Sequence, residues 1–149
     1  MALINFNFIN KLGLIIFFVS FILKSFGQVQ NENLADSIVI KSEMNSYSKL
    51  IFISNCNHAA KIAEIDLKKG QSYIFLSGGI APKVYSNDSI FEKKYNIQFY
   101  DFGCVAAQKE CIIHYNSIVF NSLKKQYGKK WQKEIRKDVI GLKEWKKNN

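Results

Sequence analysis

Three cysteines and two histidines are the residues of this sequence best suited to metal binding: Cys56, His58, Cys104, Cys111 and His114. Cys56-x-His58 and Cys111-x-x-His114 would supply two pairs of sulfur and nitrogen ligands, a set that zinc accepts. Their spacing matches no common zinc frame, however. We therefore predict no metal site and no cofactor, and keep a metal-binding protein as an alternative.

Nucleophilic catalysis is the second chemistry open to these residues. A Cys56 thiolate could use His58 or His114 as its base, with Asp101 orienting the imidazole ring. No nucleophile elbow and no cysteine signature of a known enzyme family surrounds Cys56. We therefore predict no catalytic residues and favour a protein that is not an enzyme, with a Cys-His hydrolase or transferase as the alternative.

The cysteines could also pair with one another if the chain is exported. We predict a disulfide between Cys104, which ends an expected strand, and Cys111, at the start of an expected helix. The six-residue loop between them can bring the two Cα atoms within the roughly 4.4–6.8 Å that a disulfide requires. Cys56 bonded to either of them is the next alternative, and three free thiols are the third.

A glycine-containing loop after an expected central strand is the place where a small ligand would sit. This loop lacks the lysine and the following helix of a phosphate-binding loop. Residues after it and on the adjacent expected strand could reach the same ligand. The predicted ligand-binding residues are Ser77, Gly78, Gly79, Tyr85, Tyr100 and Asp101.

The N-terminus predicts export. Residues 12–23 form an apolar run that is short for a membrane span, which takes about 20 residues. Ser25 and Gly27 fit the −3 and −1 positions of a signal-peptidase site, so we predict a signal peptide over 1–27. An uncleaved N-terminal anchor is the alternative. We expect residues 28–36 to be a flexible lead-in to a single domain over 37–149, in the periplasm or secreted.

The positive charge lies at the C-terminus. Residues 28–123 hold nine lysines and nine acidic residues, whereas residues 124–149 hold ten Lys or Arg and three acids, a net charge of +7. Apolar residues at helical spacing predict a basic amphipathic helix over 129–147. Its apolar side could pack on the domain, or the helix could rest on an anionic surface. The predicted contact residues are Lys133, Arg136 and Lys137.

Hydrophobic patterns predict the remaining elements. Strands are expected at 37–41, 49–54, 71–77 and 97–102. A helix that Asn57 caps and Gly70 ends is expected between them, with a strand as the alternative. A short helix should begin at a capping box of Ser89 and Glu92 and stop at Asn96, and a long helix should span 109–127. We therefore expect an α+β domain in which two C-terminal helices cover one face of a small antiparallel or mixed sheet of about four strands.

Three strings in the second half of the chain carry a family resemblance. They are FEKKY at 91–95, YDFGC at 100–104 and GKKWQKEIRKDVIGLKEW at 128–145. With them, the stretch from about 77 to 145 resembles small exported bacterial proteins of the FEKKY-domain type. The resemblance implies a secreted or periplasmic setting, but it implies no activity and no functional residue.

Together these patterns favour an exported, monomeric binding or interaction module. The predicted partner is an acidic protein or an anionic surface of the cell envelope, reached through the basic C-terminal helix. Nucleic acid is not expected as a partner, because export would remove the chain from it.

Overall fold

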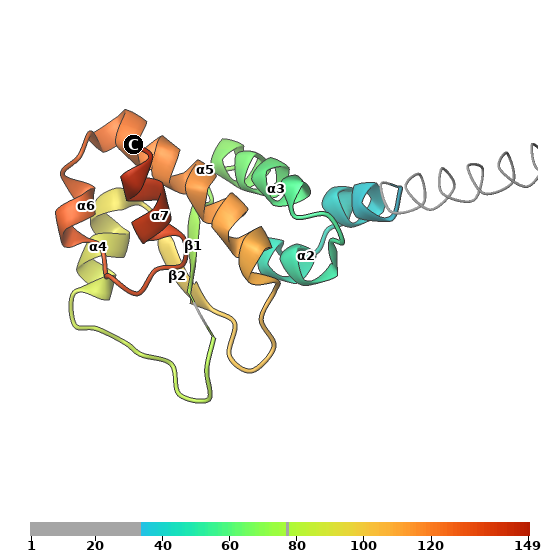
Figure 1. The fold of residues 1–149 in the computed structure, drawn as a ribbon, viewed down its shortest axis with the longest axis horizontal. Coiled ribbons are helices and arrows are strands. Elements are labelled where there is room, and N and C mark those ends of the chain that lie inside the picture. The colour runs from blue at the N-terminus through green and yellow to red at the C-terminus, as the bar shows by residue number, and fades with distance from the viewer. Residues whose placement is uncertain (1–33, 77) are drawn as a thin grey trace, which may run out of the picture. The chain divides into compact units, whose positions relative to one another are not determined.

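Two short strands form a parallel pair, and the chain crosses between them through a helix (Figure 1). Strand β1 is Tyr73–Leu76, helix α4 is Asp88–Tyr95 and strand β2 is Gln98–Asp101. The computed structural model describes residues 34–149 apart from 77, and within them this pair is the only sheet. A parallel pair requires such a crossover, because a tight hairpin joins only antiparallel strands.

Helices α3 (Asn57–Lys68) and α5 (Lys109–Tyr127) lie side by side and run in the same direction (Figure 1). Both confirm predictions from the sequence: α3 is helical rather than extended, and α5 has the predicted bounds. Gly128 follows the last turn of α5 with a φ of 66°, a conformation in which glycine has no Cβ to clash. The core between these helices and β1 is rich in aromatic side chains, including those of Phe75, Tyr115 and Phe120.

A buried carboxylate joins three helices in this core. Asp66 of α3 accepts a hydrogen bond from the Ser46 hydroxyl of α2 (Ser46–Phe52) at 2.7 Å and another from the Tyr115 hydroxyl of α5 at 2.5 Å. Burial, together with the neighbouring Asp66 carboxylate, raises the pKa of Tyr115 far above its ordinary value. Tyr115 therefore remains a hydrogen-bond donor, and the network is structural.

The four-stranded sheet that we expected is wrong: the fold is mostly helical. Residues 37–41 and 49–52, which we expected in two of the strands, are helical. In α2 and the residue after it, the buried positions are Ser46, Lys49, Leu50 and Ile53, which is the i, i+3, i+4, i+7 spacing of a helix. Lys49 can be buried because its ammonium donates to the Ile40 carbonyl at 2.9 Å, near the end of the helical residues 36–41.

The single C-terminal helix that we expected over 129–147 is also wrong. The chain forms two short helices instead, α6 (Trp131–Glu134) and α7 (Leu142–Lys147). Ile135 is extended after α6, and Gly141 has a φ of 79° before α7, so no continuous helix can pass through them. The predicted apolar stripe is nevertheless buried, since all five of its residues lie in the core: Trp131, Ile135, Val139, Leu142 and Trp145.

Helix α4 is placed by contacts other than the predicted capping box. It begins after Asn87, and the Glu92 carboxylate accepts from the backbone N–H of Phe99 in β2 at 2.7 Å instead of returning to Ser89. Asn96 ends the helix in the left-handed conformation, with a φ of 49°, as predicted. Glu92 therefore ties the crossover helix to the strand that follows it.

The predicted signal peptide over 1–27 and most of the lead-in over 28–36 lie outside the described residues. At the end of that lead-in, Asp36 is helical and buried, so it belongs to the compact unit formed by Asp36–Asn149. Among the described residues, no helix has the length and apolar character needed to cross a membrane.

Candidate functional site

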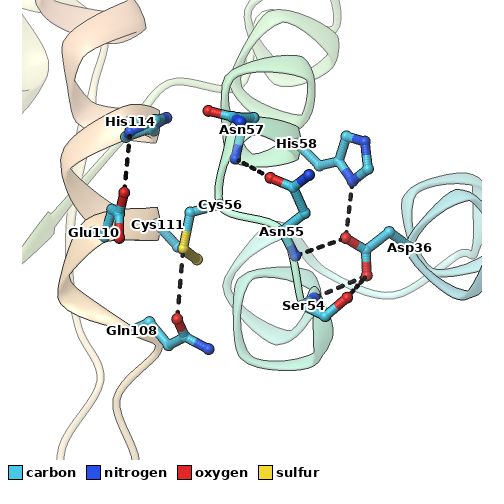
Figure 2. The surroundings of a disulfide bond; sticks show 10 residues. All are labelled: Asp36, Ser54, Asn55, Cys56, Asn57, His58, Gln108, Glu110, Cys111 and His114. Atoms are coloured by element: carbon cyan, nitrogen blue, oxygen red, sulfur yellow. Dashed lines mark hydrogen bonds and ion pairs between the residues drawn. A yellow bond between two sulfur atoms is a disulfide. The ribbon is translucent and has the colours of Figure 1, made fainter. Parts of the chain in front are cut away.

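The disulfide joins Cys56 and Cys111, and not Cys104 and Cys111 as we predicted first (Figure 2). Cys56 immediately precedes α3 and Cys111 lies in the first turn of α5, so the packing of the two helices places their starts together. Cys104 is exposed, and its thiol is free. This pairing is the alternative that the sequence left open, and it depends on a long-range contact that sequence spacing does not report.

The disulfide removes the thiol on which Cys-His chemistry would depend. Cys56 and Cys111 are oxidised, so neither can act as a thiolate nucleophile or as a zinc ligand in this form. The His114 ring lies 4.0 Å from the exposed Glu110 carboxylate on its own helix. Within the described part of the chain, no three His, Cys, Asp or Glu residues are grouped to hold a metal ion.

His58 faces Asp36 and points away from the disulfide (Figure 2). Asp36 Oδ2 lies 2.8 Å from His58 Nδ1 and also accepts from the Asn55 N–H, while Oδ1 accepts from the N–H and hydroxyl of Ser54. Burial alone would raise the pKa of Asp36, but the hydrogen bonds from Ser54, Asn55 and His58 outweigh burial and lower it. The Ser54 hydroxyl donates to Asp36 and not to the His58 ring, which would have to act as its base, so we interpret the pair as a structural link between residues 36–41 and the start of α3.

Those predicted ligand-binding residues that the structure describes make contacts in separate places. Gly78 lies so close to Gly103 that a Cβ on Gly78 would overlap the Gly103 carbonyl oxygen, so the loops after the two strands touch. Tyr100 stacks on Tyr47 with ring centroids 4.3 Å apart, and Asp101 accepts from the Gly103 N–H at 2.8 Å.

Gly79 is exposed, with open space around the position of a Cβ, and Ser77 lies outside the described residues. Tyr85 belongs to a different environment, under the guanidinium of Arg136 at 4.6 Å from the ring centroid. The two glycine loops do meet, but the five described residues of this set do not converge on one hollow around a ligand.

Arg136, one of the three predicted contact residues, is held inside the fold. Its side chain is 7% exposed and donates to both carboxylate oxygens of Asp138 at 2.7 and 2.8 Å, and to Asp88 at 2.9 Å. The hydrogen bonds with Asp138 raise the pKa of Arg136 and lower that of Asp138. Arg136 therefore joins α4 to the C-terminal segment and is not available to a partner.

Most lysines in the same part of the chain are exposed, in contrast to Arg136. Residues 124–149, here called the basic C-terminal segment, carry eight exposed lysines: Lys125, Lys129, Lys130, Lys133, Lys137, Lys143, Lys146 and Lys147. None of the eight forms an ion pair with another described residue. Two of the three acids in the segment are already engaged, Glu134 by Lys94 at 2.8 Å and Asp138 by Arg136. The segment therefore presents a positive charge that the described part of the fold does not compensate.

Close packing joins α6 and α7, the two short helices of this segment. The Trp131 ring of α6 and the Trp145 ring of α7 lie 5.5 Å apart, both against Phe120 of α5. Lys146 also donates to the Gln132 carbonyl at 2.9 Å, which ties α7 to α6. The buried tryptophans thus hold α6 and α7, which both carry exposed lysines, against a shared core.

No protein family model, no curated protein and no solved structure matches this chain. The resemblance to FEKKY-type proteins stays a prediction, and function has to be inferred from the residues of this chain.

Proposed function

We propose that this chain is an exported, non-enzymatic binding module that attaches to an anionic surface of the cell envelope through its basic C-terminal segment. The observation that supports this most strongly is the set of eight exposed lysines without an ion-pair partner among the described residues. Clustered lysines near an anionic lipid surface contribute about 1 kcal/mol each.

The proposed contact is electrostatic and involves no insertion of an apolar helix face. Trp131 and Trp145 are 0% and 6% exposed, so the tryptophans that could have entered a lipid interface are committed to the core. An interfacial helix needs a free apolar face. The apolar stripe of this segment is buried, so its exposed lysines would make the contact.

Two features support the exported setting. A disulfide between buried cysteines is typical of proteins that function outside the reducing cytoplasm. The N-terminal pattern of an apolar run followed by Ser25 and Gly27 is that of a signal peptide.

The experiment compares two triple variants with the same loss of charge. Lys129→Gln, Lys130→Gln and Lys133→Gln together remove charge from the basic C-terminal segment, whereas Lys61→Gln, Lys68→Gln and Lys69→Gln remove it from and just after α3. All six side chains are exposed, so neither variant should disturb the core. Co-sedimentation measures binding to vesicles of phosphatidylglycerol and phosphatidylcholine, with phosphatidylcholine vesicles as the uncharged control.

We expect the C-terminal triple variant to bind anionic vesicles on the order of 100-fold more weakly than wild type, since three lysines are lost. The α3 variant should bind almost like wild type, and high salt should release the wild-type protein. Equal losses in both variants would mean that only net charge matters. That result, or unchanged binding in the C-terminal variant, would reject the proposed surface.

A further inference from the structure

A hollow of about 410 Å³ lies between the start of α5 and the stretch that leads into α7. Its floor is apolar and is formed by side chains that the core already holds: Ala107, Ile112 and Val139 are all buried and line it. Val139 is fixed in place by an antiparallel bridge to Leu76 of β1. The hollow is therefore built on residues that the core holds in place, and its size falls within the range of small-molecule sites.

Three lysines from different parts of the chain line the same hollow: Lys109, Lys137 and Lys143. None of them forms an ion pair with a described residue. The lining contains two carboxylates. Arg136 binds both oxygens of Asp138, whereas Glu144 forms no ion pair with a described residue. The lining thus holds three lysines without an ion-pair partner among the described residues and one unengaged carboxylate, around an apolar floor.

We propose that this hollow binds a small amphiphilic anion, a monocarboxylate with an alkyl chain of medium length. The alkyl chain would cover the apolar floor, which is favourable in proportion to the apolar area removed from water. The carboxylate would lie among Lys109, Lys137 and Lys143, where charge-assisted hydrogen bonds are stronger than those of a neutral group. This site goes beyond the proposed attachment to a surface, because it selects a molecule for its apolar part as well as its charge.

Decanoate below its micellar concentration is the probe, and 1-decanol, decyltrimethylammonium and acetate are its comparisons. Binding is measured by calorimetry and located by amide chemical shifts in two-dimensional NMR of the folded protein. We expect decanoate to shift the amides of residues 106–112 and 137–144, and each comparison molecule to bind at least about tenfold more weakly. Decanol lacks the charge, acetate lacks the chain and decyltrimethylammonium has the wrong sign.

Two variants test the lining without touching the core. Lys109→Gln with Lys143→Gln removes two of the three charges, and Ala106→Glu adds a carboxylate to an exposed position of the lining. Each should weaken decanoate binding roughly tenfold or more. The matched control is Lys129→Gln with Lys133→Gln, which removes the same charge outside the hollow and should leave decanoate binding unchanged.

Equal affinity for decanoate and decanol, shifts confined to other residues, or unchanged decanoate affinity in both lining variants would overturn the proposal. The control pair separates it from the proposed surface attachment. Lys129 and Lys133 belong to the vesicle experiment and Lys109 does not, so loss of one kind of binding with retention of the other shows which of the two proposals fails.

Discussion

The side-chain amide of Asn116 pairs with the backbone of Phe75 as a neighbouring strand would. Asn116 Oδ1 accepts from the Phe75 N–H at 2.9 Å, and Nδ2 donates to the Phe75 carbonyl at 2.9 Å and to the Ile140 carbonyl at 3.0 Å. Asn116 is fully buried in α5. One side chain thus satisfies the edge of β1 opposite β2 and fixes the turn that leads into α7, at a position where unpaired backbone groups would be costly.

Replacing Asn116 should therefore destabilise the protein strongly. Asn116→Leu keeps a similar volume but removes the partner of three backbone groups, of which the two on Phe75 are buried, and we expect a loss of about 3 kcal/mol in the free energy of unfolding. Asn116→Asp should cost more, because it places a carboxylate oxygen against two carbonyl oxygens. Denaturant unfolding followed by circular dichroism measures both. A loss below about 1 kcal/mol for Asn116→Leu would contradict the strand-like role.

The contact between the two loops after the strands predicts that substitutions at two adjacent glycines will differ in their effect on stability. Gly78→Ala would place a Cβ on the Gly103 carbonyl and should destabilise the protein by about 1–3 kcal/mol. Gly79→Ala meets open space, and its effect should stay within about 0.5 kcal/mol. Thermal unfolding of the two variants is the measurement. Equal stabilities would show that the loops do not touch at Gly78.

The disulfide should contribute strongly to stability, because it closes a long loop of the chain. The sequence separation of 55 between Cys56 and Cys111 gives about 4 kcal/mol in the loop-entropy estimate, so Cys56→Ala with Cys111→Ala should lose roughly that amount. Cys104→Ser is the control and should change little, because Cys104 is exposed and unbonded. Mass spectrometry of the alkylated, unreduced protein should find the label on Cys104. Label on Cys56 would refute this pairing.

Asp36 should make stability depend on acid pH. Its pKa in the folded protein lies below the ordinary value of 3.8, so its carboxylate stabilises the fold fully above that pH. This stabilisation is lost as the pH falls through the lower, folded-state pKa. Asp36→Asn replaces one carboxylate oxygen with an NH₂ group, so either the Ser54 groups or the Asn55 and His58 groups lose their acceptor. We expect a cost of about 2–3 kcal/mol at pH 7.

The difference in unfolding free energy between wild type and Asp36→Asn should then shrink below about pH 4. Denaturant unfolding at a series of pH values gives this difference directly. A difference that is constant down to about pH 2 would show that the Asp36 charge does not stabilise the fold.

The sequence predicted the elements whose signals are local. The apolar face of α5, its length and Gly128 gave the correct bounds, and Asn96 marked the end of α4. The apolar stripe of the basic C-terminal segment correctly indicated burial, although Gly141 prevents a single helix. In each case the residues that decide the structure are neighbours along the chain.

The wrong predictions depend on distant partners. The isoleucine and valine run at 38–40 favoured a strand by propensity, yet Asp36 and Lys49 hold these residues in a helix through contacts with Ser54 and Ile40. Positions 46 and 49 of α2 are buried but polar, so the helical spacing was hidden from a hydrophobic pattern. Disulfide connectivity likewise cannot be deduced from three cysteine positions.

The most direct test of the proposed surface is to map where an anionic membrane touches the folded protein. Small vesicles containing phosphatidylglycerol are titrated into the isotopically labelled wild-type chain, and the intensity of each amide signal is followed by NMR. The account predicts that signals of residues 124–133 and 142–147 weaken first, that those of α3 persist longest, and that high salt restores them. Signals that weaken first in α3, or an unchanged spectrum at low salt, would contradict it.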